Sequence, residues 1–226
     1  MELVKKGKTK DVYLLENGNY LLKFKDTVTG HPGGEKDPGG NSVVGEVAGV
    51  GSNALNVTSY YFELLKSKKV PTHYVRSDVK KCEMEVRPAK MFGDGLEFVC
   101  RYAAYGGFVR RFGAYCKEGD QLDAVFEVTL KDDGRDDPPA TKEILAALKL
   151  LTPVQYDVTE KMCKEICGVV RDDLKRKGLN LVDIKLEFGI VDGKIMLIDE
   201  ISGGNMRVYQ GAKKLDYLEL AELICK

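Results

Sequence analysis

The stretch Asn180-Leu181-Val182-Asp183-Ile184-Lys185-Leu186-Glu187-Phe188-Gly189 decides the fold class, because apolar and charged residues alternate strictly from Val182 to Phe188. Such alternation is typical of a β-strand that buries one face and keeps the other polar. The turn Val191-Asp192-Gly193-Lys194 follows, and the apolar run Ile195-Met196-Leu197-Ile198-Asp199-Glu200 predicts the returning strand of a hairpin. The C-terminal part of the chain is therefore expected to contain a sheet with one charged face.

The charged face of this hairpin is the first candidate for chemistry. Asp183, Lys185 and Glu187 are spaced two residues apart, so their side chains point to the same side of the strand. Asp199 lies on the returning strand, within cross-strand reach if the turn is tight. Two facing carboxylates in a cleft would suit a divalent cation such as Mg²⁺. The alternative is an ordinary solvated sheet face.

The rest of the chain mixes strands and helices without the βαβ rhythm of a doubly wound sheet, which indicates an α+β fold. Residues 30–51 hold eight glycines and two prolines and are expected to form a loop. Gly18, between two β-rich runs, predicts a hairpin turn near the N-terminus. Strands are expected at 11–15, 20–24, 72–76, 81–89, 97–101 and 122–131, and helices at 53–69, 140–150 and 153–177.

Composition excludes several classes of protein. The 226 residues carry 35 basic and 35 acidic side chains, which argues against a nucleic-acid-binding surface spread over the whole chain. No run of 18 apolar residues is present to span a membrane, and residues 1–6 lack a signal-peptide core. The six cysteines form no C-x-x-C pair and are expected to be reduced thiols. We therefore expect a cytoplasmic protein with no nucleic-acid or membrane partner.

The run Lys6-Gly7-Lys8-Thr9-Lys10 is the second candidate. It ends like a Walker A loop, but the glycine required five residues before Gly7 is replaced by Glu2. A glycine among lysines at a strand turn can still cover phosphates, whereas the plainer interpretation is a frayed basic terminus. Lys90 and several arginines are weaker candidates for gripping phosphate or carboxylate groups, namely Arg101, Arg110, Arg111 and Arg207.

Taken in order, these segments resemble the phosphoribosylaminoimidazole-succinocarboxamide synthase (SAICAR synthetase) family. The match rests on Gly7-Lys8-Thr9-Lys10 with Val12-Tyr13, on Lys131-Asp132-Asp133 with Asp137-Pro138, and on residues 181–189 followed by Asp199-Glu200-Ile201-Ser202. The resemblance implies a two-lobed α+β fold, with an antiparallel N-terminal lobe at 1–92, a larger mixed lobe at 93–226 and a nucleotide cleft between them. It also implies that ATP phosphorylates the carboxylate of carboxyaminoimidazole ribotide and that the amine of aspartate then displaces phosphate.

The resemblance also implies a role for individual residues. Lys131, Lys185 and Asp183 are expected to be catalytic, and Glu187 and Asp199 to bind Mg²⁺. The residues expected to bind the ribotide are Arg101, Gly107, Asp137, Asp183 and Arg207. The residues expected to bind ATP are Gly7, Lys8, Thr9, Lys10, Val12, Lys90, Glu97, Lys131, Glu187 and Asp199. A homodimer is plausible on the same ground.

The chain departs from the family pattern in the part expected to hold the ribotide. Gly107 stands where the family has a serine, and Gly203-Gly204 stands where it has Pro-Asp. These changes leave a second hypothesis open, a related ATP-dependent carboxylate–amine ligase or small-molecule kinase with another substrate. A third hypothesis is a binding protein without enzymatic activity.

Overall fold

The computed structural model describes residues 1–30, 33–34, 37, 40, 42–135 and 137–226. The chain divides into two compact units. The first unit contains residues 1–89, 200–205 and 215–226, and the second contains 90–199 and 206–214. The division predicted from the sequence assigned all of 93–226 to one lobe, whereas residues 200–205 and 215–226 pack within the first unit.

The first unit is built on a five-stranded antiparallel sheet with the strand order β1-β2-β3-β7-β6. Its strands are β1 (Glu2–Lys6), β2 (Lys10–Leu14), β3 (Tyr20–Phe24), β6 (Tyr74–Asp78) and β7 (Glu83–Val86), with a 3₁₀ turn at Val79–Lys81. The turn between β2 and β3 contains Gly18 at φ 82°, a left-handed conformation that glycine adopts easily. The predicted N-terminal hairpin is therefore present, and the additional strand β1 extends it.

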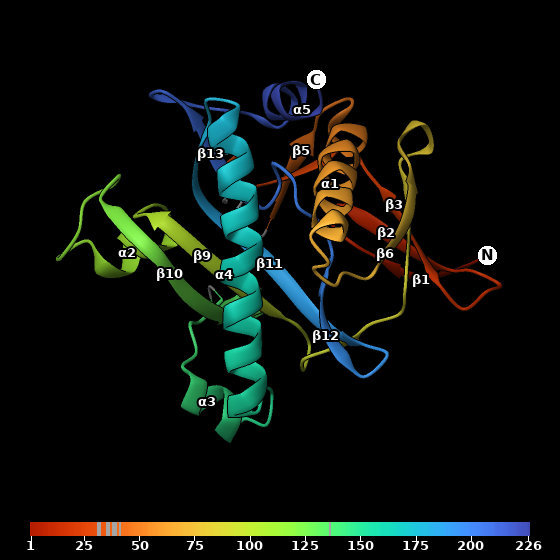
Figure 1. The fold of residues 1–226 in the computed structure, drawn as a ribbon, viewed down its shortest axis with the longest axis horizontal. Helices are drawn as coiled ribbons and strands as arrows, with labels where there is room; N and C mark the ends of the chain where they lie inside the picture. Colours follow the sequence, from red (N-terminus) through yellow and green to blue (C-terminus); the bar gives the residue numbers. More distant parts are fainter. Residues whose placement is uncertain (31–32, 35–36, 38–39, 41, 136) are drawn as a thin grey trace. The chain divides into compact units, whose positions relative to one another are not determined.

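Two helices complete the first unit and lie side by side (Figure 1): α1 (Val50–Ser67) and α5 (Tyr217–Cys225). The buried face of α1 includes Leu55, Phe62 and Leu65, all of them fully buried. Asp216 begins α5, and its side chain accepts hydrogen bonds from the backbone of Leu218 and Glu219. Helix α5 thus packs against a helix from the first third of the sequence.

The glycine-rich segment 30–51 is not a loop throughout, contrary to expectation. Strand β4 (Thr27–Gly30) pairs with β5 (Ser42–Glu46) in a separate two-stranded sheet, and α1 begins at Val50. The carboxylate of Asp26 accepts hydrogen bonds from the backbone of Gly49 and Gly51, which ties the start of α1 to the end of β3. Part of the predicted loop, residues 31–32, 35–36, 38–39 and 41, lies outside the described residues.

The second unit is built on a seven-stranded sheet whose central strand is β11 (Asn180–Val191). Its path runs β10-β9-β11-β13-β14, and β8 and β12 also pair with β11. The other strands are β8 (Lys90–Met91), β9 (Leu96–Ala103), β10 (Gln121–Leu130), β12 (Lys194–Ile198), β13 (Met206–Gln210) and β14 (Lys213–Lys214). The hairpin predicted from residues 182–200 is therefore present as β11 and β12.

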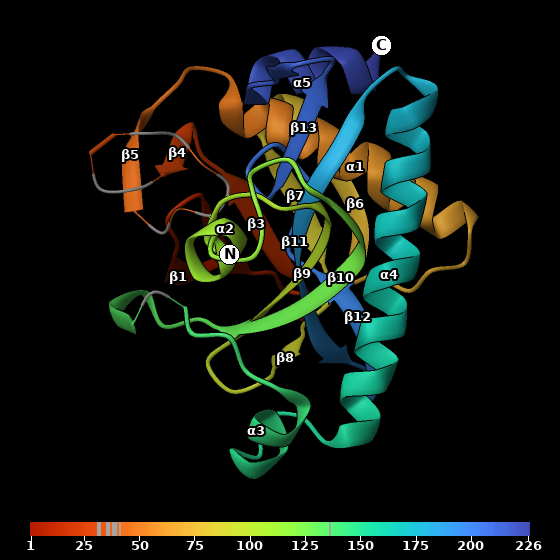
Figure 2. The ribbon, with the colours of Figure 1, turned by 90° about the vertical axis from the view of Figure 1, so that its left-hand side faces the viewer.

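Helix α4 (Pro153–Arg176) runs along β9, β10 and β11 (Figure 2). It begins with a capping box in which the side chains of Thr152 and Gln155 bond each other's backbone, and proline occupies the first turn. The apolar residues of β11 form the core of this unit; Ile184, Leu186 and Phe188 are at most 1% exposed. Two shorter helices, α2 (Gly107–Phe112) and α3 (Lys142–Ala147), and a 3₁₀ turn at Asp133–Arg135 complete the unit. No helix in the described ranges is long and apolar enough to cross a membrane.

Candidate active site

The predicted phosphate turn lies between β1 and β2 of the first unit. The backbone N–H of Gly7 donates to the carbonyl of Lys10 at 2.9 Å, which closes the turn. A Cβ on residue 7 would lie 2.3 Å from the same carbonyl oxygen, so only glycine fits there. Lys25 donates from Nζ to the carbonyl of Gly7, and Thr27 donates from Oγ1 to the carbonyl of Lys8. The run from Gly7 to Lys10 is thus an ordered turn rather than a frayed terminus.

Lys10 occupies a nearly buried position at the end of this turn. Its ammonium group forms an ion pair with Glu200, and both side chains are 10% exposed. The other carboxylate oxygen of Glu200 accepts a hydrogen bond from Ser202 Oγ at 2.6 Å. The ammonium group also lies 5.1 Å from the centre of the Phe24 ring. These contacts fix the direction in which Lys10 points.

The segment from Ser202 to Asn205, where the chain departs from the family pattern, is a closed turn within the first unit. The side chain of Asn205 accepts from the backbone of Ser202 at 2.8 Å and donates to the carbonyl of Glu200 at 2.5 Å. Ser202 Oγ in turn accepts from the backbone of Gly204 at 2.9 Å. A Cβ on Gly203 would come within 3.2 Å of Tyr217 Cα. The serine and the asparagine thus hold the turn without a proline.

The predicted metal carboxylates lie in the second unit, Glu187 on β11 and Asp199 directly after β12. Glu187 faces Ile198 in the strand pairing, so Asp199 follows the residue opposite it. Burial raises the pKa of Glu187 and the negative charge of Asp199 raises it further, while Lys131 acts in the opposite direction. Asp199 has φ 63°, an unusual backbone conformation for a residue with a side chain. The two carboxylates are therefore close enough to feel each other's charge.

Lys131 joins this pair from the end of β10. Its Nζ donates to Glu187 Oε1 at 2.5 Å. Burial alone would lower the pKa of Lys131, but the charges of Glu187 and Asp199 outweigh burial and raise it. The aliphatic stem of the lysine passes over Gly95, where a Cβ would lie 2.9 Å from Lys131 Cδ. Gly95 thus leaves the space through which Lys131 reaches the carboxylates.

Lys185 lies between Asp183 and Glu187 on the same face of β11. Its Nζ donates to Glu97 Oε1 at 2.7 Å, and the Glu97 side chain is 8% exposed. Thr129 Oγ1 donates to the other oxygen of Glu97 at 3.4 Å. The buried carboxylate therefore holds the ammonium group of Lys185 at the centre of the charged face.

The third position, Asp183, belongs to a buried network of charges. Asp183 Oδ2 accepts hydrogen bonds from Arg101 and from Arg207, both at 2.7 Å. Arg101 also donates from Nε to Glu127 Oε2 at 2.5 Å, and Glu127 Oε1 accepts from Arg111 at the same distance. Arg101, Arg207 and Asp183 are each at most 7% exposed at the side chain. The structure thus brings together three of the five residues expected to bind the ribotide.

The remaining predicted residues occupy different places. Gly107 is the first residue of α2, next to the guanidinium group of Arg111. Asp137 lies in the loop after β10 and accepts from the backbone of Asp132 at 2.8 Å. Lys90 is exposed on β8, which pairs with β11. Val12 is a partly buried residue of β2 opposite Leu22.

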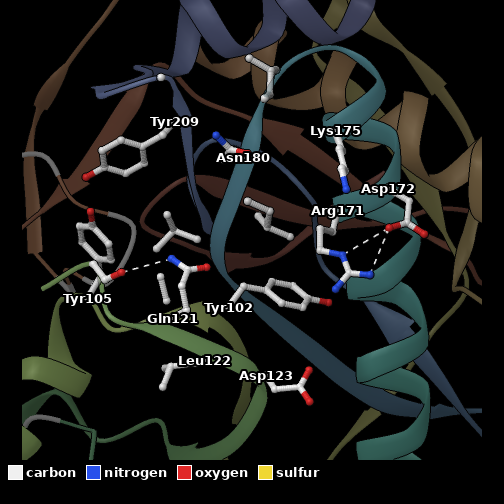
Figure 3. A pocket seen from close by; sticks show the side chains of 16 residues that line it. Tyr102, Tyr105, Gln121, Leu122, Asp123, Arg171, Asp172, Lys175, Asn180 and Tyr209 are labelled. Carbon is white, nitrogen blue, oxygen red and sulfur yellow. Dashed lines mark hydrogen bonds and ion pairs between the residues drawn. The ribbon is translucent and has the colours of Figure 1, made fainter. Parts of the chain in front are cut away.

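A cavity of about 570 Å³ lies elsewhere in the second unit, and none of the predicted residues lines it (Figure 3). Its wall combines aromatic and charged side chains, including Tyr102, Tyr209, Arg171 and Lys175. Arg171 stacks 4.8 Å above the Tyr102 ring and pairs with the exposed Asp172. Burial raises the pKa of Tyr209 to about 12. The cavity wall thus mixes basic, acidic and aromatic side chains.

Sequence reasoning missed several residues that hold the predicted ones in place. Glu127 and Glu200 each bind a predicted cation, and Ser202 and Asn205 shape the turn beside Glu200. Glu127 is one charged residue in an apolar stretch of β10, and the Ser-x-x-Asn spacing at 202–205 is typical of a side-chain-closed turn. Neither sequence pattern is specific enough to identify a site residue.

Comparison with known proteins identifies the family of this chain. Residues 3–217 match the family model described as SAICAR synthetase. The chain is 55% identical over 226 residues to the phosphoribosylaminoimidazole-succinocarboxamide synthase of Clostridium tetani, with 99% of each chain covered.

This chain belongs to the SAICAR synthetase family. The Sulfolobus acidocaldarius synthase is 36% identical over 91% of this chain and 83% of its own. A solved SAICAR synthetase structure in complex with ADP matches with a TM-score of 0.87 and 25% identity, covering 98% of this chain and 97% of the other. The synthase structure from Ehrlichia chaffeensis, at 22% identity, has the same TM-score and supports the fold alone.

Membership in the SAICAR synthetase family confirms the resemblance inferred from the sequence, and the α+β fold with antiparallel sheets is confirmed by the matching structures. The family assignment and the Clostridium tetani relative identify the chain as an ATP-dependent carbon–nitrogen ligase.

Proposed function

We propose that this chain joins the carboxylate of carboxyaminoimidazole ribotide to the amine of aspartate in de novo purine biosynthesis, with ATP as the energy source. The arrangement on β11 carries this proposal. Asp183, Lys185 and Glu187 occupy successive positions on one strand face, about 7 Å apart. Each is paired with a different kind of partner: a pair of arginines, a buried carboxylate and Lys131.

The reaction needs such an arrangement because a carboxylate is a poor acyl donor. Transfer of the γ-phosphoryl group of ATP to a carboxylate oxygen forms an acyl phosphate and releases ADP. The amine of aspartate then attacks the acyl carbon, the C–N bond forms, phosphate leaves and the amine loses a proton. Lys131 and Lys185 are suited to stabilise the negative charge that develops during both transfers.

The carboxylates of Glu187 and Asp199 fit a bound Mg²⁺. Both offer hard oxygen ligands, and the negative charge of Asp199 raises the pKa of Glu187. Within the described ranges no cluster of three or more Asp, Glu, His or Cys side chains is arranged to hold a metal. Mg²⁺ is commonly bound by one or two carboxylates together with phosphate oxygens. The ion would spread the charge of the transferring phosphoryl group.

The remaining residues are assigned either to ATP or to the ribotide. In the first unit, the turn from Gly7 to Lys10 is assigned to the ATP phosphates, and Val12 follows it on β2. In the second unit, Lys90 and Glu97 complete the set proposed for ATP. The residues proposed for the ribotide are Arg101, Gly107, Asp137, Asp183 and Arg207.

An ADP-release assay tests this function directly. We expect ADP to form only when the ribotide, aspartate and Mg-ATP are all present, and omission of any one should abolish the signal. Tight binding of Mg-ATP without turnover on this pair of substrates would instead favour a ligase or kinase of the same family with another substrate. Absence of both ADP release and Mg-ATP binding would contradict both enzymatic proposals and favour a binding protein.

Location and assembly are part of the proposal. The six cysteines are all free thiols, which supports the cytoplasm as the compartment. A homodimer stays a prediction that sedimentation or light scattering of the purified chain would test.

A further inference from the structure

The turn at Gly106-Gly107 in the second unit brings two guanidinium groups to one piece of backbone. Gly106 has φ 53°, and a Cβ there would lie 2.7 Å from Arg207 Nη2. A Cβ on Gly107 would lie 3.0 Å from Arg111 Nη1. The two glycines therefore leave room for two arginines to approach the same turn.

Arg111 reaches this position because it lies one helical turn after Gly107 on α2. Its Nη2 donates to Glu127 Oε1 at 2.5 Å, while its Nη1 lies at the turn. Contacts of its aromatic side chains hold α2 in place. The guanidinium group of Arg101 lies 5.8 Å from the centre of the Phe108 ring, and Phe108 packs on Phe112. Glu127 and α2 thus fix both ends of the Arg111 side chain.

The charges around this turn favour an anion. Arg101, Arg111 and Arg207 share the two carboxylates of Glu127 and Asp183 in one chain of ion pairs. Arg101 and Arg207 are 7% exposed, whereas the Arg111 side chain is 27% exposed. Arg111 is therefore the member of the chain that an anion arriving from solvent can contact directly. A planar guanidinium group binds phosphate through two parallel hydrogen bonds, which a lysine cannot do.

We propose that Arg111 is a third guanidinium ligand for the phosphate of the ribotide, held in position by Glu127 and admitted by the absence of a side chain at Gly107. This inference rests on the proposed function, because it assigns the phosphate of that substrate to the arginine chain. It makes Arg111 a residue that distinguishes the phosphorylated substrate from its nucleoside.

Arg111→Ala tests the proposal through discrimination between these two forms of the substrate. We expect the KM for the ribotide to rise roughly 10- to 100-fold, as for loss of a charged hydrogen-bond pair, with kcat within about twofold of wild type. The kcat/KM for the dephosphorylated riboside should change less than threefold. Arg176→Ala is the matched control, since Arg176 is an exposed arginine paired with Asp173 at the end of α4 in the same unit. It should leave both substrates unaffected.

Arg111→Lys keeps the positive charge and most of the volume, so it serves if the alanine variant folds poorly. It should retain part of the affinity for the ribotide. Calorimetric titration with ribose 5-phosphate gives a reading that does not depend on turnover, and we expect its Kd to rise in both Arg111 variants. An unchanged KM and Kd in Arg111→Ala, or a fall in kcat with unchanged KM, would overturn the role of Arg111.

Failure of the proposed function looks different from failure of this inference. A wild-type chain that releases no ADP with the ribotide and aspartate contradicts the function, and the titration with ribose 5-phosphate still decides whether Arg111 binds a sugar phosphate. An active wild type whose Arg111 variants keep full affinity contradicts the inference alone.

Discussion

The ammonium group of Lys131 contacts Glu187 at 2.5 Å, although the two residues lie 56 positions apart in the chain. The contact joins the end of β10 to the charged face of β11. Because Asp199 also acts on both residues, Lys131 is the cation that offsets two neighbouring carboxylates. Substrate phosphates and Mg²⁺ would bind among these charges. Lys131 and Glu187 are therefore the first targets for mutation.

Lys131→Met and Lys185→Met remove an ammonium group and keep an unbranched side chain. We expect each to lower kcat about 100-fold while the Kd for Mg-ATP changes less than threefold, because charge on the transferring group is greatest in the transition state. Steady-state kinetics and equilibrium nucleotide titration measure the two quantities separately. If both variants merely raised the apparent KM for ATP, the catalytic role would be wrong.

Glu187→Gln removes one of the two carboxylates assigned to Mg²⁺ at nearly constant volume. The Mg²⁺ concentration for half-maximal ADP release should rise at least tenfold, since neutral ligands bind this ion less strongly. Glu160→Gln is a suitable control, because Glu160 lies on α4 and forms an ion pair with Lys164. An unshifted Mg²⁺ curve for Glu187→Gln would exclude it as a ligand.

Lys10→Ala should cost about 3 kcal/mol of unfolding free energy, because it leaves the buried carboxylate of Glu200 without its cation. The double variant Lys10→Ala with Glu200→Gln should recover much of this loss, and chemical denaturation of the four proteins completes the cycle. Additive effects would mean that the ion pair contributes little. The KM for ATP should rise in both variants that lack Lys10.

Gly7→Ala places a methyl group 2.3 Å from the carbonyl oxygen of Lys10 and should force the phosphate turn open. We expect weaker Mg-ATP binding, by about tenfold or more, together with a lower melting temperature. Gly168→Ala is the contrasting control: Gly168 lies within α4 with nothing near its Cβ position, so this change should stabilise by about 1 kcal/mol. Normal ATP affinity in Gly7→Ala would remove the turn from the nucleotide site.

Glu85 predicts an acid sensitivity that is independent of catalysis. Hydrogen bonds from Asn19, Asn17 and Arg76 lower the pKa of this carboxyl from 4.5 to about 2. A carboxyl whose pKa is lowered by folding stabilises the folded state at pH values above its pKa in the unfolded chain. This contribution is lost as the pH falls from about 4.5 through 2. Glu85→Gln should therefore destabilise by about 1–2 kcal/mol at pH 7 and by much less near pH 2. A difference that is constant with pH would contradict the assignment.

The charged strand face could be predicted from the sequence because its period of two is a direct consequence of strand geometry. The same rule placed Asp183, Lys185 and Glu187 on one side before any partner was known. What it could not supply is the partner of each residue. Glu97, Lys131 and Arg101 lie 56 to 88 residues before the β11 residues that they contact, and contacts over that distance leave no local pattern.

The errors have physical causes as well. The glycine-rich stretch conceals the short pair β4 and β5, because glycine lowers strand propensity even where backbone pairing forms. The strand β13 is only five residues long, and neither it nor the helix α5 was predicted, although a capping box begins α5 at Asp216. The six-residue helix α2 was not predicted either. The roles of the individual site residues remain predictions for the experiments above.

Helix α5 packs against α1, although about 150 residues separate them in the sequence. During synthesis on the ribosome, α1 would therefore leave the exit tunnel long before its covering helix exists. Leu220 and Ile224 are buried residues of α5, each 1% exposed in the finished fold, and until they emerge α1 lacks its covering helix. The packing of α1 is therefore complete only after α5 has been synthesised. Fragments that stop before Tyr217 should be targets for chaperones and proteases.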